Sequence, residues 1–176
     1  MLKSNKFNFV YCAAVSALAV GLAITPANAL PGQSVKTVLS WAKTKPQLPT
    51  LTYSDEVHSY NGTKGKLHFY AGVTAQNGTV THEGITISGD SSFKFTKKSA
   101  RVVKLIQNIY NANIGNDFQK SRYVTKIGRD QFYRGQNYAY IAAEVQGGTN
   151  LRIITLNSLQ GEINNARYCQ THQCDL

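Results

Sequence analysis

The spacing of apolar residues divides the chain after residue 30 into helical and extended stretches. From Val35 onward, apolar side chains recur at intervals of three and four, which predicts a helix that Ser34 caps and that runs to about Lys45. Between residues 51 and 87 the period changes to two. This alternation predicts a three-stranded antiparallel meander with one buried face.

Two Asn-Gly pairs interrupt this alternating segment, and such pairs are strong hairpin signals. Asn61-Gly62 and Asn77-Gly78 therefore predict the two turns of the meander. A threonine follows each pair, so the same positions match the pattern of an N-glycosylation acceptor. The sequence leaves open whether Asn61 and Asn77 carry glycans, and in a bacterial host they would be bare hairpin turns.

The second half repeats the order of helix and strands. Apolar rows predict a helix from about residue 97 to 113, which Gly115 would end, and alternation predicts three or four strands between residues 123 and 156. The expected fold is α+β, with two helices packed on an antiparallel sheet of about six strands in the order α-βββ-α-βββ(β). The halves resemble each other only in this order of elements.

Residues 1–29 have the pattern of a secretory signal peptide. Lys3 and Lys6 form a basic start, residues 9–24 are almost wholly apolar, and an Ala-Asn-Ala sequence ends at Ala29. The apolar run is shorter than the roughly 20 residues of a membrane-spanning helix. We therefore expect cleavage after Ala29, a secreted or periplasmic protein, and no transmembrane segment in the mature chain.

Composition supports one globular domain over residues 30–176. The chain has 176 residues, of which 42% are hydrophobic, and this argues against disorder and against collagen-like repeats. It carries 19 Lys and Arg against 9 Asp and Glu. Cleavage would remove two lysines and no acid, which lowers the net charge from +10 to +8. A basic exported protein is expected to meet anionic partners.

Cleavage would also remove Cys12, which leaves Cys169 and Cys174 as the remaining pair of cysteines. In an exported protein such a pair predicts a disulfide. The alternative is a metal site that includes His172. Structural metal sites usually need four ligands and catalytic sites three, with oriented outer partners, so we expect a disulfide, no metal site and no cofactor.

A first basic set surrounds the start of the second predicted helix, and it comprises Lys94, Lys97, Lys98, Arg101 and Lys104. Cations near a helix N-terminus oppose the helix dipole, at a cost of a few tenths of a kcal/mol each. Their retention is consistent with an anion-binding site, because helix N-termini already favour anions. The alternative interpretation is a solvated, charged face.

A second basic set is interleaved with aromatic residues, and its candidate partner-binding residues are Arg122, Arg129, Tyr133 and Arg134. Arginine combined with exposed tyrosine suits glycans, nucleic-acid bases or protein hot spots. Export argues against a physiological nucleic-acid partner. Some of these tyrosines are expected to serve the sheet instead.

Three histidines fall in the predicted meander. The register implied by the Asn-Gly turns places Val57 on the buried face and the histidines on the outer face, with His58 opposite His68 and His82 opposite Gly72. His58 and His68 would then be exposed neighbours. Glu56 would share this face and is the candidate third ligand. Two imidazoles and one carboxylate without outer partners to orient them make a weak metal site, so we expect none there.

Catalytic motifs are absent from the sequence. It contains no G-x-S-x-G and no H-E-x-x-H, and the adjacent Asp55 and Glu56 would point to opposite faces of a strand. The favoured function is a binding or accessory role toward an anionic polymer, a lipid surface or an acidic protein. The alternatives are a small hydrolase that uses the strand histidines and a secreted inhibitor or effector of another protein.

Export predicts a defined N-terminus. In the native host, N-terminal sequencing of the abundant form should begin at Leu30, because the basic, apolar and small-residue regions all direct cleavage after Ala29. An abundant form that begins at Met1 or Leu2 would contradict this prediction.

Overall fold

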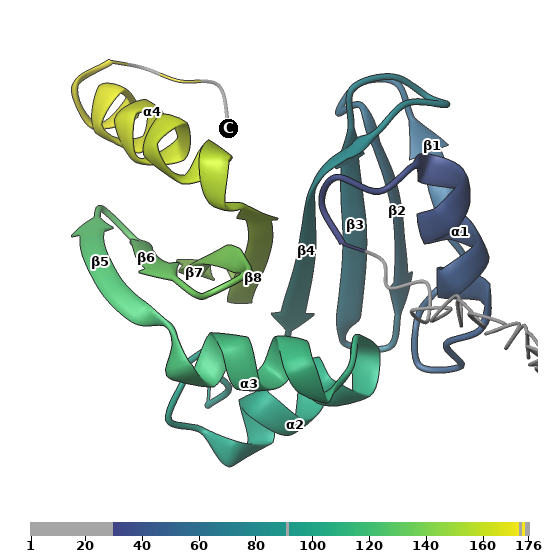
Figure 1. Ribbon diagram of the computed structural model, residues 1–176, viewed down its shortest axis with the longest axis horizontal. Coiled ribbons are helices and arrows are strands. Elements are labelled where there is room, and N and C mark those ends of the chain that lie inside the picture. Colours follow the sequence, from purple (N-terminus) through teal and green to yellow (C-terminus); the bar gives the residue numbers. More distant parts are fainter. Residues whose placement is uncertain (1–29, 91, 173, 175–176) are drawn as a thin grey trace, which may run out of the picture.

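The computed structural model describes residues 30–90, 92–172 and 174 (Figure 1). The predicted signal peptide and its cleavage site lie outside this part. The first half contains α1 (Val35–Lys43), β1 (Thr52–Ser54), β2 (Ser59–Lys64), β3 (Leu67–Val73) and β4 (Val80–Ser88). The second contains α2 (Ala100–Ile109), α3 (Ala112–Lys120), β5 (Arg122–Ile127), β6 (Asp130–Arg134), β7 (Tyr138–Val145), β8 (Gly148–Thr155), a short 3-10 turn (Leu156–Ser158) and α4 (Leu159–Thr171).

The strands form one antiparallel sheet of eight strands, in the order β1-β2-β3-β4-β8-β7-β6-β5. Each half is a four-stranded meander, and the last strands of the two meanders pair with each other. The α+β prediction is confirmed, but the expected count of about six strands was too low. The edge strand β1 has only three residues, and the alternation of apolar residues from residue 51 onward does not separate it from β2.

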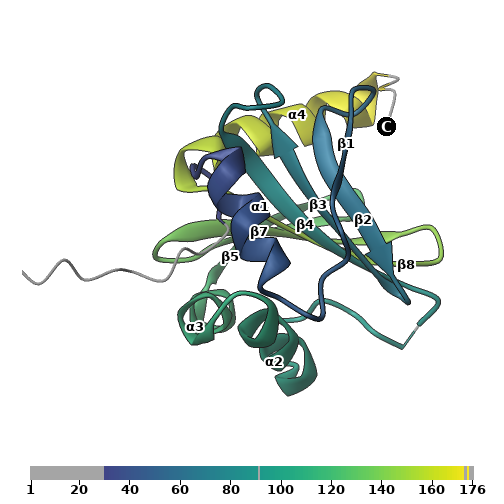
Figure 2. The ribbon, with the colours of Figure 1, turned by 90° about the vertical axis from the view of Figure 1, so that its right-hand side faces the viewer.

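The helices occupy both faces of the sheet, whereas we expected two helices on it. Helices α1, α2 and α3 share one hydrophobic core with what we call the inner face. Helix α4 packs on the opposite, outer face, where Leu159 and Ile163 contact Phe132, Ile141 and Ile154. Figure 1 shows α4 on one side of the β5–β8 half and α2 and α3 on the other, and Figure 2 shows α1 against the β1–β4 half.

The single helix predicted for residues 97–113 is two helices. Asn111 leaves the helical conformation, and its side chain accepts a hydrogen bond from Ile114 N at 3.0 Å, which caps α3. Gly115 does not end a helix but lies inside α3. A Cβ atom there would come within 2.3 Å of Gln107 Cγ, so glycine permits the close packing of α3 on α2.

The first hairpin turn of the meander also differs from the prediction. Asn61-Gly62 lies in the middle of β2, and the chain reverses instead at Gly65, where φ is +59°. Gly62 is explained by packing, because a Cβ atom there would lie 2.2 Å from Thr50 O. The second Asn-Gly pair, at residues 77–78, does lie in the connection between β3 and β4.

The Asp117 carboxylate binds the backbone that leads into β7, and no local sequence pattern marks this residue. Its buried carboxylate accepts hydrogen bonds from Gln136 N at 2.7 Å, from Tyr138 N at 3.3 Å and from Tyr140 Oη at 2.8 Å. Burial, and then this bond to Asp117, raise the pKa of Tyr140. The carboxylate thus connects α3 to the start of a central strand.

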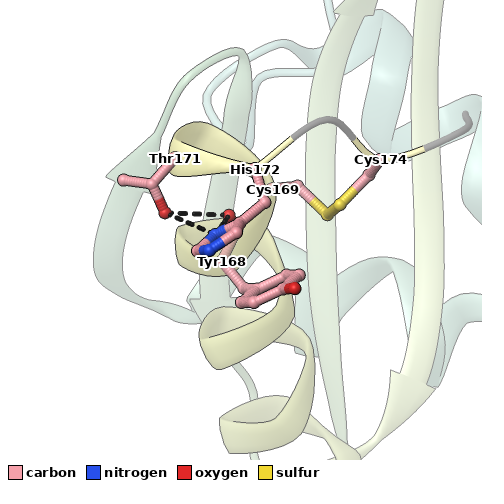
Figure 3. Close-up of a disulfide and its surroundings, with 5 residues drawn as sticks. All are labelled: Tyr168, Cys169, Thr171, His172 and Cys174. Carbon is pink, nitrogen blue, oxygen red and sulfur yellow. Dashed lines mark hydrogen bonds between the residues drawn. A yellow bond between two sulfur atoms is a disulfide. The ribbon is translucent and has the colours of Figure 1, made fainter.

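The predicted disulfide is present at the C-terminal end of α4. Cys169 and Cys174 are bonded, with their Cα atoms 5.3 Å apart (Figure 3). His172 stacks on Tyr168, with a centroid separation of 4.0 Å. Because both sulfurs are engaged with each other, they do not provide the thiolate ligands that the alternative metal site requires.

The disulfide should be detectable directly. Trypsin cleaves after Arg167, so mass spectrometry of the unreduced protein should show the peptide 168–176 as a closed ring. Because the loop is short, replacing both cysteines by serine should lower the free energy of unfolding by less than about 3 kcal/mol. Two thiols that react with an alkylating agent before reduction would contradict the pairing.

Candidate functional site

A groove of about 490 Å³ lies beside α2, at the end of the β3–β4 pair that is near the β2–β3 turn. We call it the basic groove. Its floor is apolar and its rim carries cations. The floor consists of Leu67, Ile87, Phe93, Leu105 and Ile109.

The floor forms where the inner face of the sheet is only partly covered. Leu67 and Ile87 are opposite each other in β3 and β4, and both are half-buried. Leu105 and Ile109 come from one face of α2, where Ile109 is fully buried and Leu105 is half-buried. The loop before α2 adds Phe93, which is 6% exposed.

The rim carries four cationic side chains and a single carboxylate. The cations are Lys64, Lys66, Arg101 and Lys104, and the carboxylate is Asp90. Arg101 Nη2 lies 3.2 Å from Asp90 Oδ2. A hydrogen bond from Ser92 and then the contact with Arg101 lower the pKa of Asp90, which therefore stays ionised at neutral pH.

Neutral groups hold two of the lysines in place. Lys66 Nζ donates to Gly89 O at 3.0 Å, and Lys64 Nζ donates to Pro46 O. Because carbonyl oxygens carry no net charge, these bonds position the ammonium groups without neutralising them. At the other end, Gln47 Nε2 donates to Asn108 O at 2.7 Å and joins the segment after α1 to α2. The groove is therefore held in shape before any ligand binds.

The first basic set does not form one cluster, because only two of its five residues lie on the basic groove. Arg101 and Lys104 lie on the rim of the basic groove. Lys94 pairs with Glu144 at 2.7 Å, and Lys97 donates to the Ser121 carbonyl. Helix α2 begins at residue 100, so the lysines at 94, 97 and 98 precede the helix and do not lie in its first turn.

Lys64 and Lys66 were absent from the candidate site drawn from the sequence. The signal that marks them is the Lys-Gly-Lys sequence of the β2–β3 turn, which brings two cations to one end of the sheet. They are more than 30 positions from Arg101 and Lys104. Only the packing of α2 on the sheet brings the two pairs of cations together.

The second basic set lies on the β5–β6 edge of the sheet. Arg122 and Arg134 are exposed and directly opposite each other, and Arg129 is exposed in the intervening turn. Tyr133, however, is only 7% exposed, so it is part of the core and offers little contact surface. The exposed aromatic ring at this edge belongs to Tyr123, which is 52% exposed.

The predicted pairing of His58 with His68 is wrong. Thr63 lies opposite His68, and His58 lies in the turn between β1 and β2 with φ at +42°. His58 precedes Thr63 by five positions, or roughly 15 Å of extended chain. Val57 is 63% exposed and is not on the buried face. The shifted turn accounts for all of these differences, because register sets which side chains face each other.

His82 does lie opposite Gly72, as predicted. On the outer face the rings of His68, Tyr70 and His82 form a row with centroid separations of 5.8 and 5.9 Å. Gly72 and Gly84 leave the room that the His82 and Tyr70 rings occupy. Burial lowers the pKa of both histidines, so they are largely neutral at pH 7 and add little charge to this face.

Glu83 is the most perturbed carboxyl group of the described residues. It projects from β4 into the inner core, is fully buried, and has no hydrogen-bond partner there for either oxygen. Burial raises the pKa of Glu83 to about 8, and the neighbouring Tyr110 opposes this rise. Burial, and then the charge of Glu83, raise the pKa of Tyr138. A carboxyl of this kind is a candidate functional group, and it is also a cost to stability.

Comparison with known proteins does not assign the chain to a family. No family model matches the sequence, and no curated protein or solved structure matches it. Within the described ranges, no helix has both the length and the apolar character needed to cross a membrane.

The buried position of Glu83 predicts a dependence of stability on pH. The folded state keeps the proton up to about pH 8, whereas the unfolded chain releases it near pH 4.5. The free energy of unfolding should therefore fall as pH rises through this window, by up to about 5 kcal/mol. Glu83→Gln stays neutral and should remove this part of the slope.

Urea unfolding at pH 5 and pH 8.5 measures the effect. Glu56→Gln is the matched control, because Glu56 is an exposed carboxylate. Equal pH slopes in Glu83→Gln and in the unmodified protein would contradict a raised pKa for Glu83.

Proposed function

We propose that this chain is a small exported binding or accessory protein that holds an anionic partner at the basic groove. The observation that carries the proposal is the imbalance of charge there, with four cations and one carboxylate around a single concave site. The other lining residues are the five apolar residues of the floor and the uncharged Gln47 and Asn108. It contains no pair of groups suited to general acid and base catalysis.

Electrostatics favour the groove over the other basic residues. At physiological salt the screening length is about 8 Å, so only clustered charges act together. Lys64 and Lys66 flank one turn, and Arg101 and Lys104 lie one helical turn apart on α2. Lys94, in contrast, already has a carboxylate partner in Glu144.

The expected compartment defines the class of partner. The Cys169–Cys174 disulfide suits an oxidising environment, in agreement with the export that the first 29 residues predict. A basic protein there meets anionic envelope polymers, lipid headgroups and acidic proteins. Nucleic acid is not an expected partner in that compartment.

A second candidate function uses the β5–β6 edge. Tyr123 and Val124 are exposed large apolar residues on an edge strand, with Arg122 and Arg134 beside them. Exposed tyrosine and arginine are typical of protein interfaces. This surface supports the alternative role of an inhibitor or effector that contacts another protein. The hydrolase alternative required His58 and His68 to be opposite each other, but Thr63 lies opposite His68.

The groove can be tested by removing its charges and comparing the result with a control variant of the same net charge. A variant with Lys64, Lys66 and Lys104 changed to glutamine should bind soluble polyphosphate at least about tenfold more weakly at moderate salt. The control changes three exposed lysines elsewhere, Lys98, Lys120 and Lys126. It alters the net charge equally and should bind almost normally.

Binding is measured by calorimetry at two salt concentrations. If both variants weaken to the same extent, the charge acts diffusely and the groove is not the site. If the control weakens more, the β5–β6 edge is the better candidate.

A further inference from the structure

The basic groove has an apolar floor that a purely ionic ligand would not use. Leu67, Ile87 and Leu105 are half-buried and lie together at its base, next to the buried Ile109 and Phe93. A partly exposed cluster of this kind leaves apolar surface in contact with water. Covering it with the tail of a ligand would remove this apolar surface from water, which favours binding.

We propose that the basic groove binds a single-chain anionic amphiphile, with its hydrocarbon tail on the apolar floor and its headgroup at the lysines of the rim. This inference rests on the proposed function and specifies the ligand of that same site. The basic groove has a volume of about 490 Å³, which lies in the range of small-molecule sites, about 300 to 1,000 Å³.

The cations of the rim come from two elements beside the floor, so an anionic headgroup can bind at the rim while the tail lies on the floor. Lys64 and Lys66 project from the β2–β3 turn, and Lys104 projects from α2. Ammonium groups bind both phosphate and carboxylate oxygens as compact charges. Arg101 is held by Asp90 and also lies 4.8 Å from the Phe93 ring, so it closes one side of the floor.

The position of the floor between the rim cations favours a single chain over a flat lipid surface. Ile109 is fully buried and Phe93 is 6% exposed, so the accessible apolar surface of the floor comes from Leu67, Ile87 and Leu105, which lie between the cations of the rim. A planar bilayer would reach the rim lysines but not these side chains. A separate amphiphile molecule can lay its tail on the half-buried Leu67, Ile87 and Leu105 between these cations.

The test uses the disulfide-bonded mature protein and calorimetry with four probes below their micelle concentrations. Dodecyl phosphate and laurate present the two possible anionic headgroups, dodecyl maltoside presents the tail without charge, and inorganic phosphate presents charge without the tail. We expect one-to-one binding of at least one of the two anionic amphiphiles, at least about tenfold tighter than that of either control probe.

Two variants separate the floor from the rim. Leu105→Gln should weaken amphiphile binding at least about tenfold while polyphosphate binding stays unchanged, because it removes apolar surface and no charge. Leu39→Gln is the matched control, since Leu39 is also a half-buried leucine on a helix. It should leave both affinities unchanged. Circular dichroism and the thermal midpoint verify that each variant folds.

The outcomes distinguish this inference from the proposed function. If polyphosphate binding depends on the rim lysines but Leu105→Gln does not alter amphiphile binding, the amphiphile inference fails and the proposed function stands. If neither ligand depends on the lysines, both fail. Binding to anionic vesicles without binding to monomeric amphiphiles would overturn the inference in favour of a membrane surface.

Discussion

The pairing of β4 with β8 is the constraint on which the rest of the structure depends. Seven consecutive residue pairs, from His82–Ile154 to Ser88–Gly148, join two four-stranded meanders into one sheet. Ile85 and Leu151 face each other at its centre and are fully buried. The inner faces of the halves thereby become one surface, and one core spans both. Each meander alone would leave an edge strand and an apolar face unpaired.

The same pairing determines where the basic groove lies. Beyond the end of β4, Gly89 N donates to Gly147 O at 2.9 Å, and Gly89 O accepts from Lys66 Nζ. These bonds direct the following loop toward α2, and that loop supplies Asp90 and Phe93. A slip of one residue in the register of β4 would move Ile87 to the outer face and remove half of the sheet's contribution to the floor. The groove is therefore a consequence of sheet register as much as of helix packing.

The outer face shows how one sheet supports two different surfaces. In the second half, alternate residues such as Ile141 and Ile154 are apolar, and α4 covers them. In the first half, the corresponding positions carry His68, Tyr70 and His82, and they remain half-exposed. An ion pair between Arg152 and Glu162, at 3.1 Å, ties β8 to α4 beside that row. The halves resemble each other in topology but differ in what covers them.

Local patterns in the sequence determined the features that need only nearby residues. These include the helix capped by Ser34, the alternation in β3 and β4, the turn at residues 77–78 and the Cys169–Cys174 disulfide, since each depends on contacts a few positions apart or on a simple period. Tertiary structure decided the rest. Asn61-Gly62 lies within β2, where Asn61 pairs with Thr52 on one side and Tyr70 on the other. The helix predicted over residues 97–113 is divided at Asn111, and α3 packs on α2. Only long-range packing assembled the groove from cations more than 30 positions apart, and the same packing buried Glu83, because burial and charge clustering depend on neighbours in space that no local pattern specifies.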